Sequence, residues 1–387
     1  MAIPTLEGLP TELRIVILRN ITDLSTLRSL IHGSMIYQET FHSAREAILE
    51  NIIYHQYGHM GLAQAIAAVQ SKGMHASEAS HKPGIATILN RCRHFRSGCS
   101  SRTLRATVSI TAEECVKLLD LHEEFVFFLQ DFCLTAPCPP WMDAVKWRSE
   151  MLPVRLSDVE AARILRALCR LETFCNIFGV MDREVELKPE GKQQASWIGH
   201  TYDWAEVWDI FFGTMPPWEV EEIFCVRAYL RRKYAGIFAE IANDVSRHIP
   251  GPHVYECQLH LEHMADMGPN FLYRVLHEPH KRRRDMVERN IDSAAWSIFE
   301  LMIFMIEPWG PGSLATKHCG YGIPVSSLPH VERPNLKYIR YRGRGGSVDA
   351  THLDELFRHP GMGDYDGWNW YSLIWDDERL LKLKAPL

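Results

Sequence analysis

The sequence predicts a mainly all-α protein with a three-helix N-terminal module, an irregular multi-helix body and a loop-rich, aromatic C-terminal segment. Apolar residues recur at helical spacing through most of the chain, and residues that cap helices precede several of these stretches. No internal repeat of roughly 20 to 50 residues is present, which argues against solenoid and propeller folds. We expect the three parts at 1–58, 59–309 and 310–387.

The first predicted helix begins at Pro10, because proline is tolerated at the first helical position, where no amide hydrogen is needed. Glu12 follows in the first turn, where a negative charge is favoured by the helix dipole. Leu9, Leu13 and Ile17 recur every four residues and therefore form one apolar stripe.

Two more short helices are expected before residue 58. Ser25 should cap the second and Ser34 the third, because a serine hydroxyl accepts a hydrogen bond from an amide in the first helical turn. The second helix carries Leu27, Leu30 and Ile31. The third is expected to continue to Gly58 with this apolar stripe: Tyr37, Phe41, Ala44, Ile48 and Ile52.

The body should begin with a short apolar helix between residues 61 and 73. Residues 74–105 are rich in His, Ser, Arg and Gly without a sustained period, so we expect a loop or hinge there. Thr111 and Glu114 form a capping box, in which each side chain bonds the other residue's backbone amide. They should start a helix that ends near the proline cluster at 137–140.

The second half of the body is also predicted to be helical. Ser157 and Glu160 form another capping box, and the helix that they start should end at Gly179. A longer helix is expected over 217–245, and further helices over 255–276 and 286–306. Beyond Pro308 the helical period is lost, and only 352–358 has a helical pattern in a segment that should pack on the body.

Composition and charge restrict the class of function. The net charge is −6, so no overall positive field would attract a polyanion, and we expect no nucleic-acid partner. The longest apolar stretch, 294–306, contains Glu300 and is shorter than the roughly 20 residues that span a bilayer, so we expect no membrane segment. The ten cysteines contain no CxxC pair and no secretory signal precedes them, which predicts a cytoplasmic or nuclear protein.

One N-terminal pattern carries functional content. In order, it contains Leu9-Pro10-Thr11-Glu12-Leu13, Ile17-Leu18, Ile21, Asp23-Leu24, Leu27, Leu30, Ser34 and Tyr37. This pattern resembles the F-box over residues 9 to about 50, although many members of that family carry Trp at the position of Tyr37. The remaining chain resembles, in style more than in motif, the F-box-like proteins of filamentous fungi, with its best matches at 216–219, 368–370 and 375–377.

The resemblance implies that the N-terminal module binds a Skp1-like adaptor protein and, through it, a cullin. Three short helices cannot bury all of their apolar faces, so some apolar residues remain available to a partner helix. By the same resemblance, the adaptor-binding residues would be Leu9, Pro10, Leu13, Ile17, Leu18, Leu24, Leu27, Leu30 and Tyr37. The body would then hold an unknown target protein.

No catalytic site, cofactor site or metal site is predicted. Cys257, His260 and His263 share a helix face and could ligate zinc, but their order is not that of a metallohydrolase, and we interpret them as helix surface or core. The short basic runs 281–284 and 341–346 could contact nucleic acid or act as import signals, and we interpret them as solvated faces or turns.

Eleven tryptophans include a group in the second half of the chain: Trp197, Trp204, Trp208, Trp218, Trp368, Trp370 and Trp375. Loop tryptophans can form recognition surfaces, but they also fill irregular cores, and we favour the core interpretation.

Three hypotheses follow. The first is a non-enzymatic substrate receptor of a cullin-type ubiquitin ligase. The second is a helical interaction or regulatory protein that keeps an F-box-like fold without joining a ligase. The third is an enzyme of unknown chemistry in the body, for which the sequence offers no motif.

Overall fold

The computed structural model describes residues 5–57, 61–96, 110–184, 197–245, 254–291, 328, 330–343 and 372–385. Over these residues the protein is all-α, with 74% of residues helical and 14 helices of 7 or more residues. The all-α class predicted from the sequence is confirmed. Within the same residues, no helix combines the length and the apolar character needed to cross a membrane.

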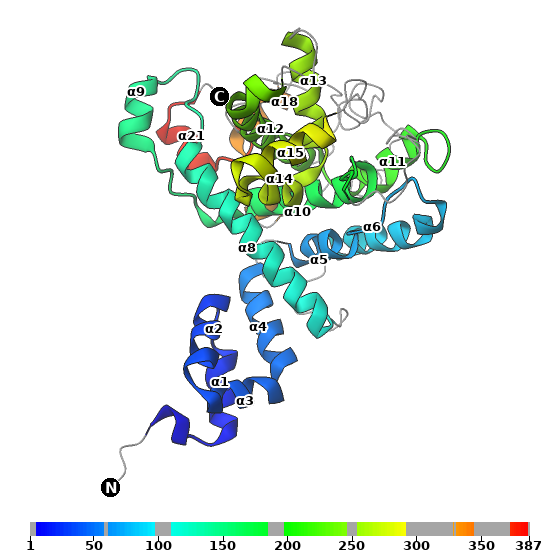
Figure 1. Ribbon diagram of the computed structural model, residues 1–387. Helices are drawn as coiled ribbons and strands as arrows, with labels where there is room; N and C mark the ends of the chain where they lie inside the picture. Colours follow the sequence, from blue (N-terminus) through cyan, green and yellow to red (C-terminus); the bar gives the residue numbers. More distant parts are fainter. Residues whose placement is uncertain are drawn as a thin grey trace.

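The N-terminal helices project from the body and are linked to it by one connecting helix (Figure 1). We call residues 5–43 the N-terminal unit, and the connecting helix, α4, leads from it to the side of α8. The elements of this part are η1 (Leu6–Gly8), α1 (Thr11–Arg19), α2 (Leu24–Gly33), α3 (Met35–Ser43) and α4 (Arg45–Tyr57).

The caps of these helices differ in part from the sequence predictions. Pro10 is the N-cap of α1 and not its first helical residue, and Asp23 replaces Ser25 as the cap of α2 because its carboxylate accepts from the amide of Thr26. Ser34 caps α3 as predicted. The third predicted helix is two helices, since the chain leaves the helical conformation at Ala44.

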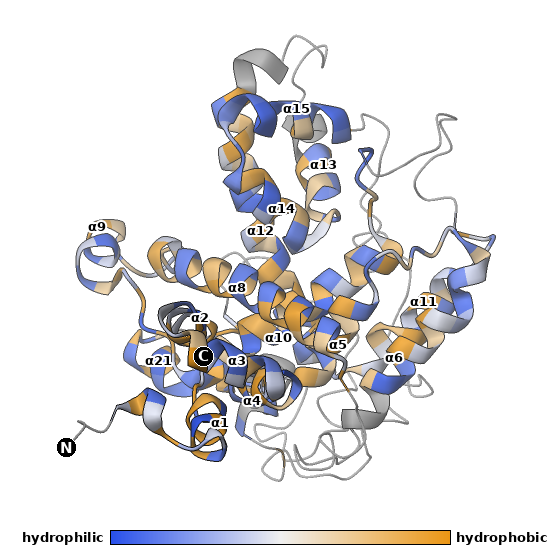
Figure 2. Ribbon diagram, turned by 60° about the horizontal axis from the view of Figure 1, so that its bottom comes forward, coloured by the Kyte–Doolittle hydropathy of each residue, from blue (hydrophilic) through white to orange (hydrophobic). Residues whose placement is uncertain are grey.

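The body contains the remaining helices. Its elements are α5 (Leu62–Gln70), η2 (Ala79–His81), α6 (Lys82–Arg96), α8 (Ala112–Thr135), α9 (Ala144–Lys146), η3 (Trp147–Met151), α10 (Asp158–Phe178), α11 (Trp204–Ile210), η4 (Phe212–Thr214), α12 (Pro217–Val245), α13 (Val254–Ala265), α14 (Gly268–His277), α15 (His280–Asn290), η6 (His330–Glu332), α18 (Leu336–Gly343) and α21 (Asp377–Lys382). In Figure 2, α5 is coloured mainly as hydrophobic and α15 mainly as hydrophilic.

Helix α10 is the centre of the body. It packs against α5, α8, α12 and α14, and 17 of its 21 residues are buried. Both predicted capping boxes are confirmed, at Thr111 with Glu114 and at Ser157 with Glu160, where each pair makes its two reciprocal hydrogen bonds. Because neighbours enclose α10 on every side, its polar side chains must find partners inside the protein.

Two sequence predictions for the body are wrong. The expected loop at 74–105 contains α6, because Ile85, Ile88 and Leu89 form a buried helical stripe within a segment whose other residues are polar. The helix expected over 255–276 is divided into α13 and α14 at Gly268, whose positive φ of 89° ends the regular helix.

Two further predictions are tested only in part. The helix expected over 286–306 begins earlier, with α15 at His280, and its second half lies outside the described residues. The pattern at 352–358 also lies outside them.

Candidate partner-docking surface

Four large apolar side chains of the N-terminal unit face solvent. The exposed fractions are 63% for Leu6, 50% for Leu13, 53% for Val16 and 75% for Met35. They come from η1, from α1 and from the start of α3. Single exposed apolar residues are ordinary, but four within 39 residues of chain indicate a surface that a partner can cover.

Three hydrogen bonds bring these elements together. Arg14 of α1 donates from Nη1 to the carbonyl of Ile36 at 3.4 Å, and Tyr37 of α3 donates from its hydroxyl to the carbonyl of Leu6 at 3.3 Å. Ser34, the cap of α3, donates to Oε1 of Glu7 at 2.5 Å. The beginnings of α1 and α3 therefore meet η1 at one corner of the unit, and the four exposed apolar side chains belong to these three elements.

The buried apolar residues of the unit begin an apolar cluster that continues through α4 into the body. Leu18 of α1, Leu27 of α2 and Tyr37 of α3 are almost completely buried, and Phe41 packs with them. Among the described residues 5–43, the one buried polar residue is Thr40, and its hydroxyl donates to the carbonyl of Ile36. The unit thus holds its shape by apolar contact without burying a charge.

The nine residues predicted to bind an adaptor do not share one surface. Three groups can be distinguished by burial: exposed Pro10 and Leu13, partly buried Leu9, Ile17, Leu24 and Leu30, and buried Leu18, Leu27 and Tyr37. The buried group supports the unit from inside, and only the other two groups reach the surface. Val16 and Met35 are exposed apolar residues that the F-box pattern did not include.

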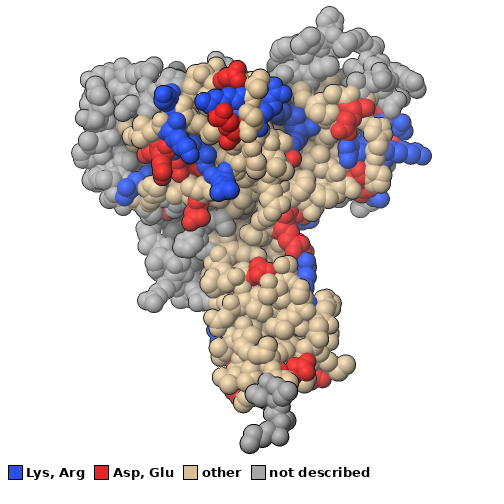
Figure 3. All heavy atoms as spheres, turned by 90° about the vertical axis from the view of Figure 1, so that its left-hand side faces the viewer, with Lys and Arg blue, Asp and Glu red and all other residues tan. Residues whose placement is uncertain are grey.

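The N-terminal unit is braced against the body through α8. Tyr57 of α4 donates its hydroxyl hydrogen to the carbonyl of Leu118 at 2.8 Å, and Arg28 of α2 forms an ion pair with Glu123 at 2.9 Å. In Figure 3 the unit carries few charged side chains on the visible face, whereas both signs of charge gather over the body.

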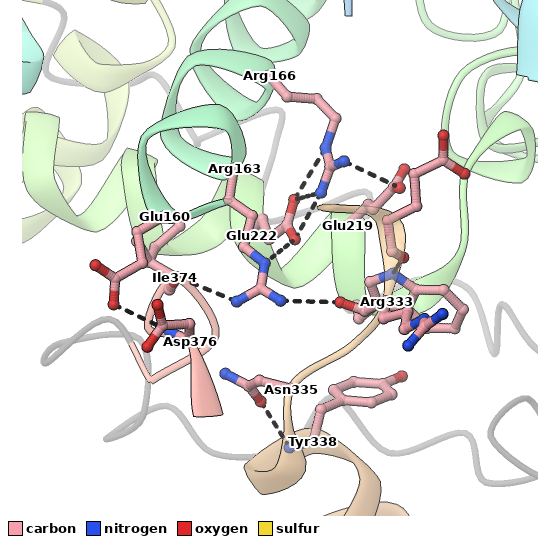
Figure 4. A network of polar contacts seen from close by, with 12 residues as sticks. Glu160, Arg163, Arg166, Glu219, Glu222, Arg333, Asn335, Tyr338, Ile374 and Asp376 are labelled. Atoms are coloured by element: carbon pink, nitrogen blue, oxygen red, sulfur yellow. Dashed lines mark hydrogen bonds and ion pairs between the residues drawn. The ribbon is translucent and has the colours of Figure 1, made fainter. Parts of the chain in front are cut away.

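A buried charge network joins α10 to α12 (Figure 4). Arg166 donates from Nη2 to both carboxylate oxygens of Glu222, at 2.8 and 2.7 Å. Arg170 pairs with Glu219 at 2.6 Å, and all four side chains are buried. Paired in this way, the charges of one helix neutralise those of the other in the interior.

Arg163 of α10 extends the network to the C-terminal residues. Its Nη1 donates to the carbonyls of Ile374 and Trp375 at 3.2 and 2.9 Å, and its Nη2 donates to the carbonyl of Arg333 at 2.9 Å (Figure 4). One guanidinium therefore fixes two segments that lie about 170 and 210 residues further along the chain. We call Arg163 and its three carbonyl partners the C-terminal clamp.

Glu160 adds a second attachment at the start of α10. Its Oε2 accepts from the amide of Ser157, and its Oε1 accepts from the amide of Asp376 at 3.0 Å and from Nε of Arg379 at 2.6 Å. The same carboxylate thus completes the capping box and holds the beginning of α21.

Arg166 keeps its charge inside this network. Burial lowers the pKa of Arg166, but the carboxylates of Glu222 and Glu219 outweigh this effect and leave the pKa above its usual value. A guanidinium with a raised pKa cannot lose its proton at physiological pH. Arg166 therefore serves as a permanent cation that holds two helices together.

The described part of the chain contains no group of three or more His, Cys, Asp or Glu side chains suited to a metal ion. His260 and His263 are buried in α13, which agrees with the core interpretation, and Nε2 of His263 lies 3.1 Å from the carbonyl oxygen of Asn290. The side chain of Cys257 lies outside the described residues. The basic run 281–284 lies in α15, with Arg282 and Arg283 paired to Glu278 and Glu240.

The core interpretation of the tryptophans is confirmed for four of them. Trp197, Trp208, Trp218 and Trp375 are buried, and Trp204 is partly buried against Trp197. Trp218 donates from its indole to the carbonyl of Glu332 at 3.0 Å, so it also ties α12 to η6. Trp368 and Trp370 lie outside the described residues.

Comparison of the chain with protein-family models, with curated proteins and with solved structures gives no match. The functional argument therefore rests on the exposed corner of the N-terminal unit and on the residues that carry the F-box pattern.

The buried network is the feature that the sequence analysis missed. Arg163, Arg166 and Arg170 are spaced at three and four residues and so share one face of α10, and Glu219 and Glu222 share a face of α12. Complementary charges at matching spacing on two helices are the signal that could have indicated their pairing.

Proposed function

We propose that the chain is a substrate-receptor subunit of a cullin-type ubiquitin ligase, in which the N-terminal unit docks on a Skp1-like adaptor protein. The observation that carries the proposal is the exposure of four large apolar side chains, Leu6, Leu13, Val16 and Met35, on elements that meet at one corner of the N-terminal unit. Such a receptor performs no chemistry and acts by raising the local concentration of its target near the ubiquitin-loading enzyme.

The energetics favour a protein partner at this corner. Full burial of a leucine is worth about 1.5 to 3 kcal/mol, so covering the exposed half of Leu13 contributes about 1 kcal/mol. The four exposed side chains together can supply several kcal/mol, which is enough to place an apolar helix in a specific position.

The brace between α4 and α8 supports the same function. Tyr57 and Leu118 fix the connecting helix to the body, and the ion pair of Arg28 with Glu123 joins α2 to the same helix of the body. A partner bound at the corner is thereby kept at a defined distance from a target bound on the body. A defined distance is what an effective local concentration requires.

A matched pair of variants tests the docking surface. Leu13→Asp places an unpaired charge in the proposed interface, where burial of a charge is costly, and should weaken adaptor binding by at least two orders of magnitude. Val145→Asp, at an exposed apolar site on α9 (68% exposed, against 50% for Leu13), should bind as the parent does. Binding is measured by titration calorimetry with a purified Skp1-like adaptor, after circular dichroism shows both variants folded.

The outcomes separate the two leading hypotheses. Parent binding to the adaptor, loss in Leu13→Asp and recruitment of a cullin through the adaptor support the ligase receptor. Adaptor binding without cullin recruitment supports a non-ligase interaction protein that keeps an F-box-like fold. If the parent does not bind the adaptor, or if Leu13→Asp binds equally well, the docking assignment is wrong.

A further inference from the structure

One histidine fixes the connection between α5 and α6 to the end of α10. We call this connection, residues 71–81, the strap. His75 is only 4% exposed, and its Nε2 lies 3.1 Å from the carbonyl oxygen of Gly179, which follows α10 directly. On the other side of the ring, Nδ1 lies 3.2 Å from the backbone nitrogen of Ser77 and 2.7 Å from its hydroxyl oxygen. Both ring nitrogens therefore have partners in the interior.

These contacts determine the protonation state of the ring. A carbonyl oxygen can only accept a hydrogen bond, so Nε2 of His75 must carry a hydrogen and donate it to Gly179. A backbone amide can only donate, so Nδ1 must be without a hydrogen and accept from Ser77. The observed arrangement of the strap therefore requires the neutral ring with its hydrogen on Nε2.

A second proton can bind only at Nδ1, where it removes an acceptor. The amide of Ser77 and the new N–H of His75 would then point at each other across 3.2 Å. The hydroxyl of Ser77 can turn and accept from the charged ring, so its contact is available in both states. The amide has no such alternative, and the buried ring would carry its charge away from water.

The other bonds between the strap and α10 do not titrate. Ala76 donates its backbone amide to the carbonyl of Ile177 at 2.8 Å, and Asn176 donates from Nδ2 to the hydroxyl of Ser71 at 3.1 Å. Neither bond includes an ionisable group. Among the described contacts of the strap with α10, pH therefore acts through His75.

Charged and titratable groups near the ring lie on the strap itself. The carboxylate of Glu78 favours a charge on His75, as does the carbonyl of Gly179, whereas His81 opposes it. Burial outweighs the favourable groups, so the pKa of His75 is below its usual value of 6.5. Protonation of His81 would strengthen its contact with Glu78, at 3.4 Å, so His81 does not explain a loosening in acid.

Helix α13 holds the end of α10 in place. Asp266 accepts from the amide of Val180 at 3.1 Å through its carbonyl, and a Cβ atom at Gly179 would clash with the same carbonyl. The carboxylate of Asp266 is bonded to Arg227 of α12, so this acidic group is already paired. Because the end of α10 is fixed by α13, the strap is the part that must move when the contact at Nδ1 is lost.

We propose that His75 is an acid-sensitive attachment point, whose neutral ring holds the strap on the end of α10 and whose protonation at Nδ1 releases the strap and the start of α6. Lys82, the first residue of α6, pairs with Glu206 of α11 at 2.7 Å and donates to the carbonyl of Thr201 at 2.8 Å. Release of the strap therefore also affects the contact between α6 and α11. This property belongs to the body and goes beyond adaptor docking.

The direction of the pH dependence follows from linkage. The closed strap binds a proton at His75 less readily than the open strap, in which the exposed ring has its usual pKa of 6.5. The closed state therefore keeps its full stabilisation above pH 6.5 and loses it progressively as the pH falls toward the lower pKa of the buried ring. From pH 7.5 to 5.5, the opening equilibrium of the strap should increase about three- to tenfold.

Hydrogen exchange of the strap amides, measured by mass spectrometry on the full chain between pH 7.5 and 5.5, tests the proposal. After correction for the intrinsic pH dependence of exchange, protection of residues 71–81 in the parent should fall about three- to tenfold. In His75→Gln, whose side-chain amide can still donate to Gly179, protection should not change with pH. The control His55→Gln, at an exposed site on α4, should behave as the parent does.

A measurement on the parent keeps the test decisive if His75→Gln does not fold. Nitrogen-15 NMR of the histidine rings in the full chain should show His75 protonated at Nε2 and not at Nδ1 at pH 7.5, with a titration midpoint below 6.5. A ring protonated at Nδ1 at this pH overturns the proposal, as does a midpoint at or above 6.5. The same conclusion follows if strap protection in the parent is independent of pH, or if folded His75→Gln keeps the parent's pH dependence.

Discussion

The N-terminal unit and the helices around α10 differ in which side chains they bury and which they expose. Residues 5–43 bury no charged side chain and expose four large apolar ones, whereas the described part of the body buries eleven Asp, Glu and Arg side chains. Over that larger region, the exposed large apolar residues are Leu134, Val145 and Leu381. The body therefore pairs buried charges of opposite sign inside the protein, while the N-terminal unit leaves large apolar side chains exposed to solvent.

The largest effect is expected at the charge network. Glu222→Ala would leave Arg166 buried without its bidentate partner, and the free energy of unfolding should fall by about 3 to 5 kcal/mol. Urea unfolding followed by tryptophan fluorescence measures this change. If the variant is as stable as Glu150→Ala, an exposed control, the body does not depend on internal pairing of its charges.

The same network offers a sharper comparison. Replacing both partners, as Arg166→Met with Glu222→Met, removes the charges together and should restore most of the stability lost in the single variant. Such recovery would show that pairing, and not the presence of charge, is what the body requires. A double variant less stable than Glu222→Ala would contradict this account.

Within the N-terminal unit, replacing buried Leu18 should reduce stability more than replacing half-exposed Leu13. Leu18→Ala creates a cavity at a fully buried side-chain position, and the unit should lose about 3 kcal/mol of stability. Leu13→Ala removes a half-exposed side chain and should cost less than about 1 kcal/mol. Hydrogen exchange over α1 to α3 measures both, and equal losses would show that the two leucines do not differ as described.

The two capping boxes provide a smaller, matched test. Glu160→Gln weakens the cap of α10 and the attachment of Arg379, so we expect a loss of about 2 kcal/mol and earlier protease cleavage near α21. Glu114→Gln weakens the capping box of α8, which is not bonded to the described C-terminal residues. It should cost about 1 kcal/mol and leave protease cleavage near α21 unchanged. The same cleavage pattern in both variants would argue against Glu160 as an attachment point.

The smallest effect is expected at the brace. Arg28 and Glu123 are each about half exposed, so Arg28→Ala should change the unfolding free energy by less than about 0.5 kcal/mol. Its effect should instead appear in the distance distribution between spin labels on α2 and α15, which should broaden. An unchanged distribution would mean that α4 alone positions the N-terminal unit.

Features that depend only on residues close together in the sequence were predictable. The capping boxes at Thr111 and Ser157 were predicted because the hydroxyl and the amide that it binds lie three residues apart. Helix α6 was missed because its buried stripe of Ile85 and Leu89 is short and surrounded by polar residues. The break at Gly268 was missed because it depends on the close approach of α10.

The candidate sites were predictable to different degrees. The sequence shows that Leu13 lies on an apolar stripe. Periodicity does not show which stripe is buried, however, so the sequence could not distinguish exposed Leu13 from buried Leu18, Leu27 and Tyr37. The partners of Arg163 are carbonyls of residues 170 to 212 positions away. A backbone carbonyl is present at every residue, so no sequence pattern marks those that accept.

The C-terminal clamp has a consequence for how the protein is made. Ribosomes add about 5 to 20 residues per second, so Ile374 and Trp375 emerge roughly 10 to 40 seconds after Arg163. During this interval all of α10 has been synthesised. The guanidinium of Arg163 still lacks the carbonyls of Ile374 and Trp375, and the carboxylate of Glu160 still lacks the amide of Asp376. The nascent body must therefore remain open around these charges, accessible to chaperones, until the last part of the chain is synthesised.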